Sequence, residues 1–251
     1  MAVLTIGVLA LQGGFSEHIT SLQRLQLHSV RVVPIQVKTP SDLAQCDALI
    51  IPGGESTTIA LLARLSGLLE PLREFVNSKP IWGTCAGAIL LAREAVGTKK
   101  GGQEVLSGVD VKVQRNGWGS QMESFEAEMT VEGMRNMEKP FRGVFIRAPV
   151  VLEVLSTSHS RSPVRVMARL SDWVAPSIAL SPCALQNVAH SGQCALPTPP
   201  NEPEPMQPDD PRHIVALMQG RHLFTTFHPE LTRDDRFHEL FVTECVAKSN
   251  S

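Results

Sequence analysis

Short apolar segments alternate with helical patterns along the first 95 residues, and this alternation constrains the fold more than any other feature. Strand-like segments occupy residues 3–10, 30–37, 48–51 and 80–83, and helical patterns occupy residues 16–25, 57–69, 72–76 and 86–95. Strands joined through helices pair in parallel, because the connection must return to the same end of the sheet. We therefore predict an α/β fold with a mainly parallel central sheet and helices on both faces. Pro34 places its strand at an edge or a bulge.

The second half of the chain has shorter strand-like segments and one segment of a different composition. Strands are expected at residues 109–113, 125–131, 144–147, 164–170 and 213–227. Residues 171–211 contain nine prolines and few large apolar residues. A structureless connection longer than roughly 15 residues is uncommon inside a compact domain. We therefore expect one domain over residues 1–251, with a Pro-rich disordered insertion at 171–211.

Composition excludes several functional classes. The chain has 251 residues, 43% of them hydrophobic, and a net charge of −2 without a basic run. This balance argues against nucleic-acid or membrane-surface binding. No apolar stretch reaches the ~18 residues of a membrane-spanning helix, and the N-terminal residues lack the features of a signal peptide. The five cysteines are odd in number and form no C-x-x-C pair, so we expect no metal site and a reducing, cytoplasmic location.

The segment Gly83-Thr84-Cys85-Ala86-Gly87 places a cysteine between glycines at a strand-to-helix turn. This arrangement is similar to the G-x-S-x-G nucleophile elbow, with cysteine in place of serine. The helix beginning near Ala86 points its positive end at Cys85, which favours the thiolate. The N–H of Ala86 can face a developing oxyanion. A buried, inert cysteine in a tight turn is the alternative.

The segment His228-Pro229-Glu230 follows an apolar strand-like run. In an extended segment His228 and Glu230 would share a face, so the carboxylate could hold the imidazole tautomer and stabilise its charged form. A solvated turn after a strand is the alternative. His18 and His238 fall on expected helices, where we predict packing or solvent contact.

The segment Pro52-Gly53-Gly54-Glu55-Ser56 ends the third strand and could present backbone N–H groups to an oxygen. A plain turn with Ser56 as helix N-cap is the alternative. Arg115 and Arg147 each follow a strand-like run, and they are candidates for carboxylate recognition or ordinary surface charges.

Together these residues resemble one family. The segments that carry the resemblance are V-L-A-L-Q-G at 8–13, P-G-G-E-S-T-T at 52–58, G-T-C-A-G at 83–87, R-N-x-x-G-S-Q at 115–121, S-F-E at 124–126, G-V-F-I-R-A-P at 143–149 and F-H-P-E-L-T at 227–232. They resemble the class I glutamine amidotransferases that serve as glutaminase subunits of pyridoxal 5′-phosphate synthase, in the vitamin B6 pathway. The resemblance covers nearly the whole chain except residues 171–211, and it implies a flavodoxin-like fold.

The resemblance implies a cysteine hydrolase acting on L-glutamine. Cys85 would attack the carboxamide carbon and form a glutamyl thioester, His228 would transfer protons, and Glu230 would orient His228. Gly54 and Ala86 would donate N–H groups to the oxyanion. The glutamine-binding positions of the family correspond to Gly54, Glu55, Ser56, Arg115, Ile146 and Arg147. No cofactor of its own is implied.

The resemblance also implies a partner. Ammonia would pass to a (β/α)₈-barrel synthase subunit, and Gln12 would face that partner and couple its docking to the turn at Gly54. Trp118 stands where the family usually has phenylalanine. The Pro-rich insertion lengthens a connection that is normally short, and it puts coupling in doubt if it covers the synthase-facing surface.

Two other functions remain open from the residues. One is a stand-alone cysteine hydrolase acting on γ-glutamyl substrates, which would work without a partner. The other is an inactive binding subunit that only assembles with the synthase. Glutamine hydrolysis that rises on adding the synthase distinguishes the amidotransferase from both.

Overall fold

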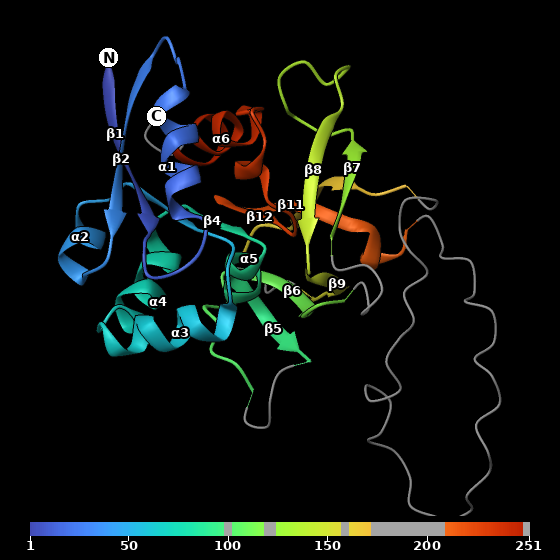
Figure 1. The fold of residues 1–251 in the computed structure, drawn as a ribbon, viewed down its shortest axis with the longest axis horizontal. Helices are drawn as coiled ribbons and strands as arrows, with labels where there is room; N and C mark the ends of the chain where they lie inside the picture. The colour runs from blue at the N-terminus through green and yellow to red at the C-terminus, as the bar shows by residue number, and fades with distance from the viewer. Residues whose placement is uncertain (98–101, 118–123, 157–160, 172–208, 248–251) are drawn as a thin grey trace, which may run out of the picture.

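The computed structural model of the chain describes residues 1–97, 102–117, 124–156, 161–171 and 209–247 (Figure 1). A seven-stranded sheet forms its centre, in the order β10-β11-β12-β4-β3-β1-β2. The strands are β1 Ala2–Leu9, β2 Val30–Val37, β3 Ala48–Ile51, β4 Ile81–Thr84, β10 Val164–Arg169, β11 Ile214–Gln219 and β12 His222–Thr225. From the other edge, the strands run β2-β1-β3-β4-β12, which is the flavodoxin-like order. Each neighbouring pair in this series is parallel. The expected mainly parallel sheet is confirmed, and β2, which contains Pro34, lies at its edge.

Helices cover both faces of the sheet, as expected. Figure 1 shows α1 (Phe15–Arg24) and α6 (Arg236–Leu240) on one face, and α3 (Ser56–Leu65), α4 (Leu69–Ser78) and α5 (Ala86–Leu91) on the other. The short α2 (Pro40–Ala44) follows β2, and a π-helical segment, η4 (Phe241–Val246), continues α6. Alternate residues of each buried strand enter opposite cores: Ile50 of β3 faces one cluster and Ile51 the other.

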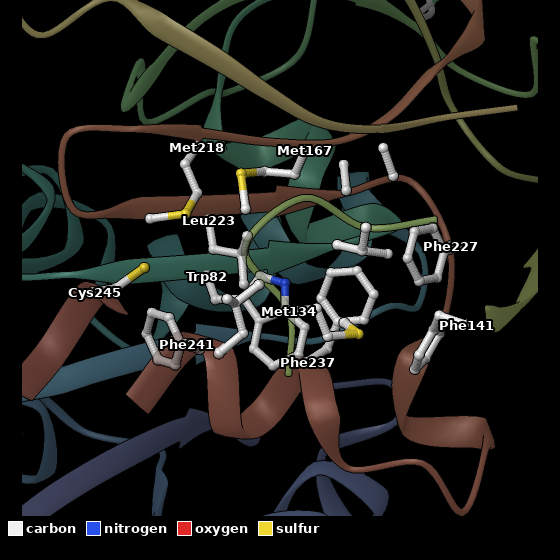
Figure 2. Packing of buried hydrophobic residues seen from close by; sticks show 14 of the residues in the cluster. Trp82, Met134, Phe141, Met167, Met218, Leu223, Phe227, Phe237, Phe241 and Cys245 are labelled. Atoms are coloured by element: carbon white, nitrogen blue, oxygen red, sulfur yellow. The ribbon is translucent and has the colours of Figure 1, made fainter. Parts of the chain in front are cut away.

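The core under α1 and α6 is rich in aromatic side chains. Figure 2 shows Trp82 of β4 among Phe237 and Phe241 from the C-terminal helical segment. The ring centroids of Trp82 and Phe241 lie 5.6 Å apart, and those of Phe141 and Phe237 4.7 Å apart, edge to face. These side chains fix the C-terminal segment against β4, the strand that leads into Cys85.

Two smaller sheets are formed by the part of the chain between β4 and β10. β5 (Ala92–Val96), β6 (Val109–Gln114) and β9 (Val150–Val154) form one, and β7 (Ser124–Met129) pairs antiparallel with β8 (Phe141–Ile146) in the other. β8 ends at Ile146, and this end of the strand lies next to Cys85.

Two local expectations were wrong. The helix expected at 86–95 ends at Leu91, and Ala92–Val96 is β5. The helix ends there because the N–H groups of Leu106 and Gly108 donate to the Leu90 and Leu91 carbonyl groups. The break between α3 and α4 lies at Gly67, with φ +72°, because Pro71 fits the first turn of α4. The strand-like residues 213–227 form two strands that turn at Gly220, and β9 is a strand that the sequence pattern did not indicate.

The expected Pro-rich insertion at 171–211 lies almost entirely outside the described residues, as does Trp118. Its last residues are described: the Asp210 carboxylate accepts the Arg212 N–H (2.8 Å) and caps a 3₁₀ helix, η2, at Pro211–His213. None of the described helices is long and apolar enough to cross a membrane.

Candidate active site

Four loops meet at the carboxyl edge of the central sheet. Gln12 follows β1, Gly54 follows β3, Cys85 follows β4 and His228 follows β12. The strands β3, β4 and β12 are direct neighbours, so parallel pairing brings the last three loops together. In open α/β sheets this edge is where ligands bind. The topology thus explains why segments far apart in sequence form one site.

Cys85 has the backbone of a nucleophile elbow, as expected. Its φ of 47° and ψ of −102° are strained for a residue with a side chain, and its N–H donates to the Thr225 carbonyl (2.9 Å). A Cβ on Gly83 would lie 2.5 Å from the Gly87 carbonyl oxygen, and one on Gly87 would lie 1.9 Å from the Ile51 carbonyl oxygen. Both glycines are therefore required by close backbone approach. The Cys85 side chain is 6% exposed at the start of α5.

His228 and Glu230 are in contact, but not through an extended segment. His228 Nδ1 lies 2.8 Å from Glu230 Oε1, and the His228 N–H donates to the Val144 carbonyl (2.8 Å). Residues Pro229–Leu231 form a 3₁₀ helix, η3, which directs the carboxylate back to the ring. The expected contact is confirmed, and the expected strand geometry was wrong. Pro229 starts a helical turn here, since its fixed φ fits that position.

The electrostatics favour a charged imidazole. Burial lowers the pKa of His228, but hydrogen bonds with Cys85 and Glu230 outweigh burial and raise it to about 10. Burial raises the pKa of Glu230, but the neighbouring His18 and His228 hold it below its ordinary value. Glu230 is therefore ionised, and a carboxylate beside an imidazolium that also faces a thiol is the arrangement of a cysteine triad.

The turn at Gly54 is held by the loop after β1. The Glu55 N–H donates to Gln12 Oε1 (2.8 Å), and the Gly14 N–H donates to the Gly53 carbonyl (3.1 Å). A Cβ on Gly53 would lie 2.2 Å from the His228 ring, so the turn packs directly against the imidazole. Gln12 takes up the Glu55 N–H, so that N–H is not free to bind an oxyanion. Ala86 begins α5, so its N–H has no partner within the helix.

Glu55 and Arg115 form an ion pair beside this turn, with Nη2 2.6 Å from Oε1. The other Glu55 oxygen accepts the Thr58 N–H (2.6 Å), so Glu55, and not Ser56, is the N-cap of α3. Burial raises the pKa of Glu55, but hydrogen bonds from Thr57 and Thr58 outweigh it and lower the pKa to about 2. Ser56 is 2% exposed, and its hydroxyl donates to Gln103.

Ile146 and Arg147 bring β8 to the nucleophile. The Ile146 carbonyl lies 3.8 Å from Cys85 Sγ, and Arg147 is exposed with a left-handed φ of 43°. The backbone of this segment, and not the Ile146 side chain, therefore faces the thiol. The expected site residues lie at or shortly after the ends of β3, β4, β6, β8 and β12, and Ser56 is buried.

The packing expected for His18 and His238 is confirmed, because both are buried, but their contacts with each other and with Glu230 were not expected. His18 Nε2 lies 3.4 Å from Glu230 Oε2, and His18 Nδ1 lies 2.9 Å from His238 Nε2. The available signal was the Gly13-Gly14 turn, which follows a buried strand and places the first turn of α1 at the same edge as Cys85. Among the described residues, no group of His, Cys, Asp and Glu side chains has the arrangement of a metal site.

Comparison with known proteins agrees with this geometry. Residues 8–171 match the model of the SNO glutamine amidotransferase family. A probable pyridoxal 5′-phosphate synthase subunit PDX2 from Arabidopsis thaliana is 44% identical over 95% of this chain and 85% of its own length. The subunit PdxT from Chloroflexus aurantiacus is 41% identical over 95% of this chain and 99% of its own length.

Solved structures give the same result. A crystal structure of a glutamine amidotransferase aligns with a TM-score of 0.67 and 37% identity, over 94% of this chain and 96% of that one. The structure of PurLQS from Thermotoga maritima aligns with a TM-score of 0.51 and 14% identity, over 100% of both chains, which shows the shared fold alone. The family resemblance seen in the sequence is confirmed, and the chain belongs to the SNO glutamine amidotransferase family.

Proposed function

We propose that this chain is the glutaminase subunit of a pyridoxal 5′-phosphate synthase and hydrolyses L-glutamine through Cys85, His228 and Glu230. The Cys85 thiolate attacks the carboxamide carbon, and the oxyanion that forms accepts N–H groups of Gly54 and Ala86. Imidazolium His228 protonates the nitrogen, and the C–N bond breaks. Ammonia departs, and a glutamyl thioester remains on Cys85. His228 then takes a proton from water, which attacks the thioester and releases glutamate and the thiolate.

The residues around Cys85 and His228 bind the glutamine substrate. The Arg115 guanidinium is a bidentate donor suited to the substrate carboxylate, and Glu55 holds it in place. The backbone groups of Gly54, Ser56, Ile146 and Arg147 line the same loops. The Cys85–Ile146 contact supports this role, because the thiol lies against that backbone.

The partner is a synthase subunit that consumes the ammonia. The similarity to synthase subunits of the PDX2 and PdxT type supports this assignment. Gln12 contacts the Glu55 N–H, so a partner that moves Gln12 would alter the turn that carries the Gly54 donor. A reduced Cys85 thiol fits a cytoplasmic location.

The observation that carries the proposal is the convergence of the Cys85 elbow, the His228–Glu230 pair and the Gly54 turn at one sheet edge. Glutaminase turnover of the full chain, with and without the synthase subunit, tests it. We expect turnover to rise when the synthase is added, and Cys85→Ala to abolish it while assembly with the synthase persists. Turnover that persists in Cys85→Ala would refute the nucleophile.

The same measurement separates the two alternatives. A stand-alone γ-glutamyl hydrolase would cleave γ-glutamyl peptides at the same rate without the synthase. An inactive binding subunit would assemble but release no ammonia from glutamine in either state.

A further inference from the structure

A hollow of about 360 Å³ lies at the edge of the central sheet opposite to Cys85. The end of α4, the segment before β10 and the turn between β11 and β12 line it. β12 and β4 are parallel, and β4 ends at the active site, so the start of β12 lies at the far edge of the sheet. The proposed mechanism uses none of the residues that line this hollow.

The hollow is positively charged. Arg161 and Arg221 line it, and none of the described residues in its wall is acidic. The ring of His222 forms part of the same wall, and burial together with the charges of Arg221 and Arg161 lowers the pKa of His222 to about 4. His222 is therefore neutral at neutral pH, and both guanidinium groups act on its ring.

The carboxylate that Arg161 contacts is shared with other groups. The fully buried Asp110 has its Oδ1 3.0 Å from Arg161 Nη1 and 3.0 Å from Arg93 Nη1. Its Oδ2 accepts a hydrogen bond from Gln219 Nε2 (2.7 Å). Arg221 has no ion pair with any residue in the described part of the chain. The cluster formed by Arg93, Arg161, Arg221 and Asp110 thus carries two uncompensated positive charges.

Both guanidinium groups at the hollow are held in place. Arg161 Nη2 donates to the Ser107 carbonyl (2.9 Å) in addition to its contact with Asp110, and Arg221 Nη2 donates to the Ser78 carbonyl. Most of their N–H groups remain available, because each contact uses a single donor of the fork. A guanidinium that is already oriented loses less conformational entropy when it binds an anion.

The charge and the size of the hollow indicate the kind of ligand. Guanidinium groups match the oxygens of phosphate in bidentate geometry, and two uncompensated positive charges suit a dianion. A volume of about 360 Å³ lies in the lower part of the range of small-molecule sites. The hydroxyl of Ser162 lies in the same wall and can donate to a further oxygen.

We propose that this hollow is a second binding site of the chain, which holds the phosphate group of a small phosphate monoester between Arg161 and Arg221. The proposal goes beyond the proposed function and does not depend on it, because Cys85 and its loops lie at the other edge of the sheet.

A titration of the full chain with glycerol 3-phosphate, followed in ¹H–¹⁵N spectra at constant ionic strength, tests the site. We expect saturable shifts of the backbone amides of Ser162, Gly220 and Arg221, and no comparable shifts with sodium acetate. Absence of saturation, equal shifts with acetate, or saturable shifts confined to other parts of the chain would overturn the proposal. The titration needs neither glutamine nor the synthase, so its failure would leave the proposed function intact.

Variants of Arg221 test the role of the guanidinium. The Arg221 side chain is exposed, and Arg221→Met should raise the Kd for glycerol 3-phosphate roughly tenfold or more, because charge-assisted hydrogen bonds are lost. Arg221→Lys keeps the charge and should recover part of the affinity. Arg31→Met is the matched control, since it removes the same charge from β2, at the end of the sheet away from β11 and β12. Equal weakening in Arg221→Met and Arg31→Met would mean that only the overall charge attracts the anion, and the proposal would be overturned.

Discussion

Replacing Glu230 by glutamine removes one buried negative charge and leaves the size of the side chain unchanged. Glu230 is 5% exposed, and its Oε1 lies 2.8 Å from His228 Nδ1. We expect Glu230→Gln to lower the pKa of His228, because a hydrogen bond to an anion no longer stabilises the imidazolium. A smaller fraction of the enzyme molecules would then have His228 in its charged form beside Cys85.

The magnitude follows from this hydrogen bond. A hydrogen bond to a charged group is worth about 1.5–3 kcal/mol, and each 1.36 kcal/mol is tenfold in rate, so kcat/KM should fall roughly 10- to 150-fold. The carboxamide keeps an oxygen that can accept the Nδ1–H, so the loss should be smaller than that of Cys85→Ala.

The assay is glutamate release from glutamine across a pH series, with the synthase subunit present. Glu239→Gln is the matched control, because Glu239 of α6 pairs with Arg135 at the surface (3.0 Å) and surface pairs contribute about 0–1 kcal/mol. Unchanged kcat/KM and an unchanged pH profile in Glu230→Gln would refute the triad.

Three further predictions follow from the site. Arg115→Met should raise KM for glutamine by about tenfold or more and change kcat far less, because the guanidinium binds substrate and takes no part in bond breaking. Gly87→Ala should lower the free energy of unfolding by roughly 1–3 kcal/mol in urea titrations, because its Cβ would overlap the Ile51 carbonyl. The raised pKa of His228 contributes stability that is complete below pH 6.5 and is lost as pH rises through about 10, so the stability difference between the wild type and His228→Gln should shrink over that range; a constant difference would contradict the assignment.

The parallel sheet and the three site segments were predictable from the sequence. Buried parallel strands are continuously apolar, and Gly83 and Gly87 mark a turn that only glycine permits. Parallel pairing of β3, β4 and β12 then places Gly54, Cys85 and His228 at one edge.

The remaining features depend on tertiary contacts. Ala92–Val96 has a composition that suits a helix, and it becomes a strand because β6 pairs with it. The contact between His228 and Glu230 was expected from extended spacing, but a 3₁₀ turn makes it. His18 and His238 are far apart in sequence and meet only because α1 and α6 cover the same face of the sheet.

The most direct test of the central claim is detection of the covalent intermediate. Acid quenching of the full chain with isotopically labelled glutamine and the synthase subunit, followed by peptide mass spectrometry, should locate a glutamyl thioester on the peptide that contains Cys85. The adduct should be absent in Cys85→Ala and reduced in Glu230→Gln. Glutamate production without any adduct on Cys85, or an adduct on another cysteine, would contradict the account.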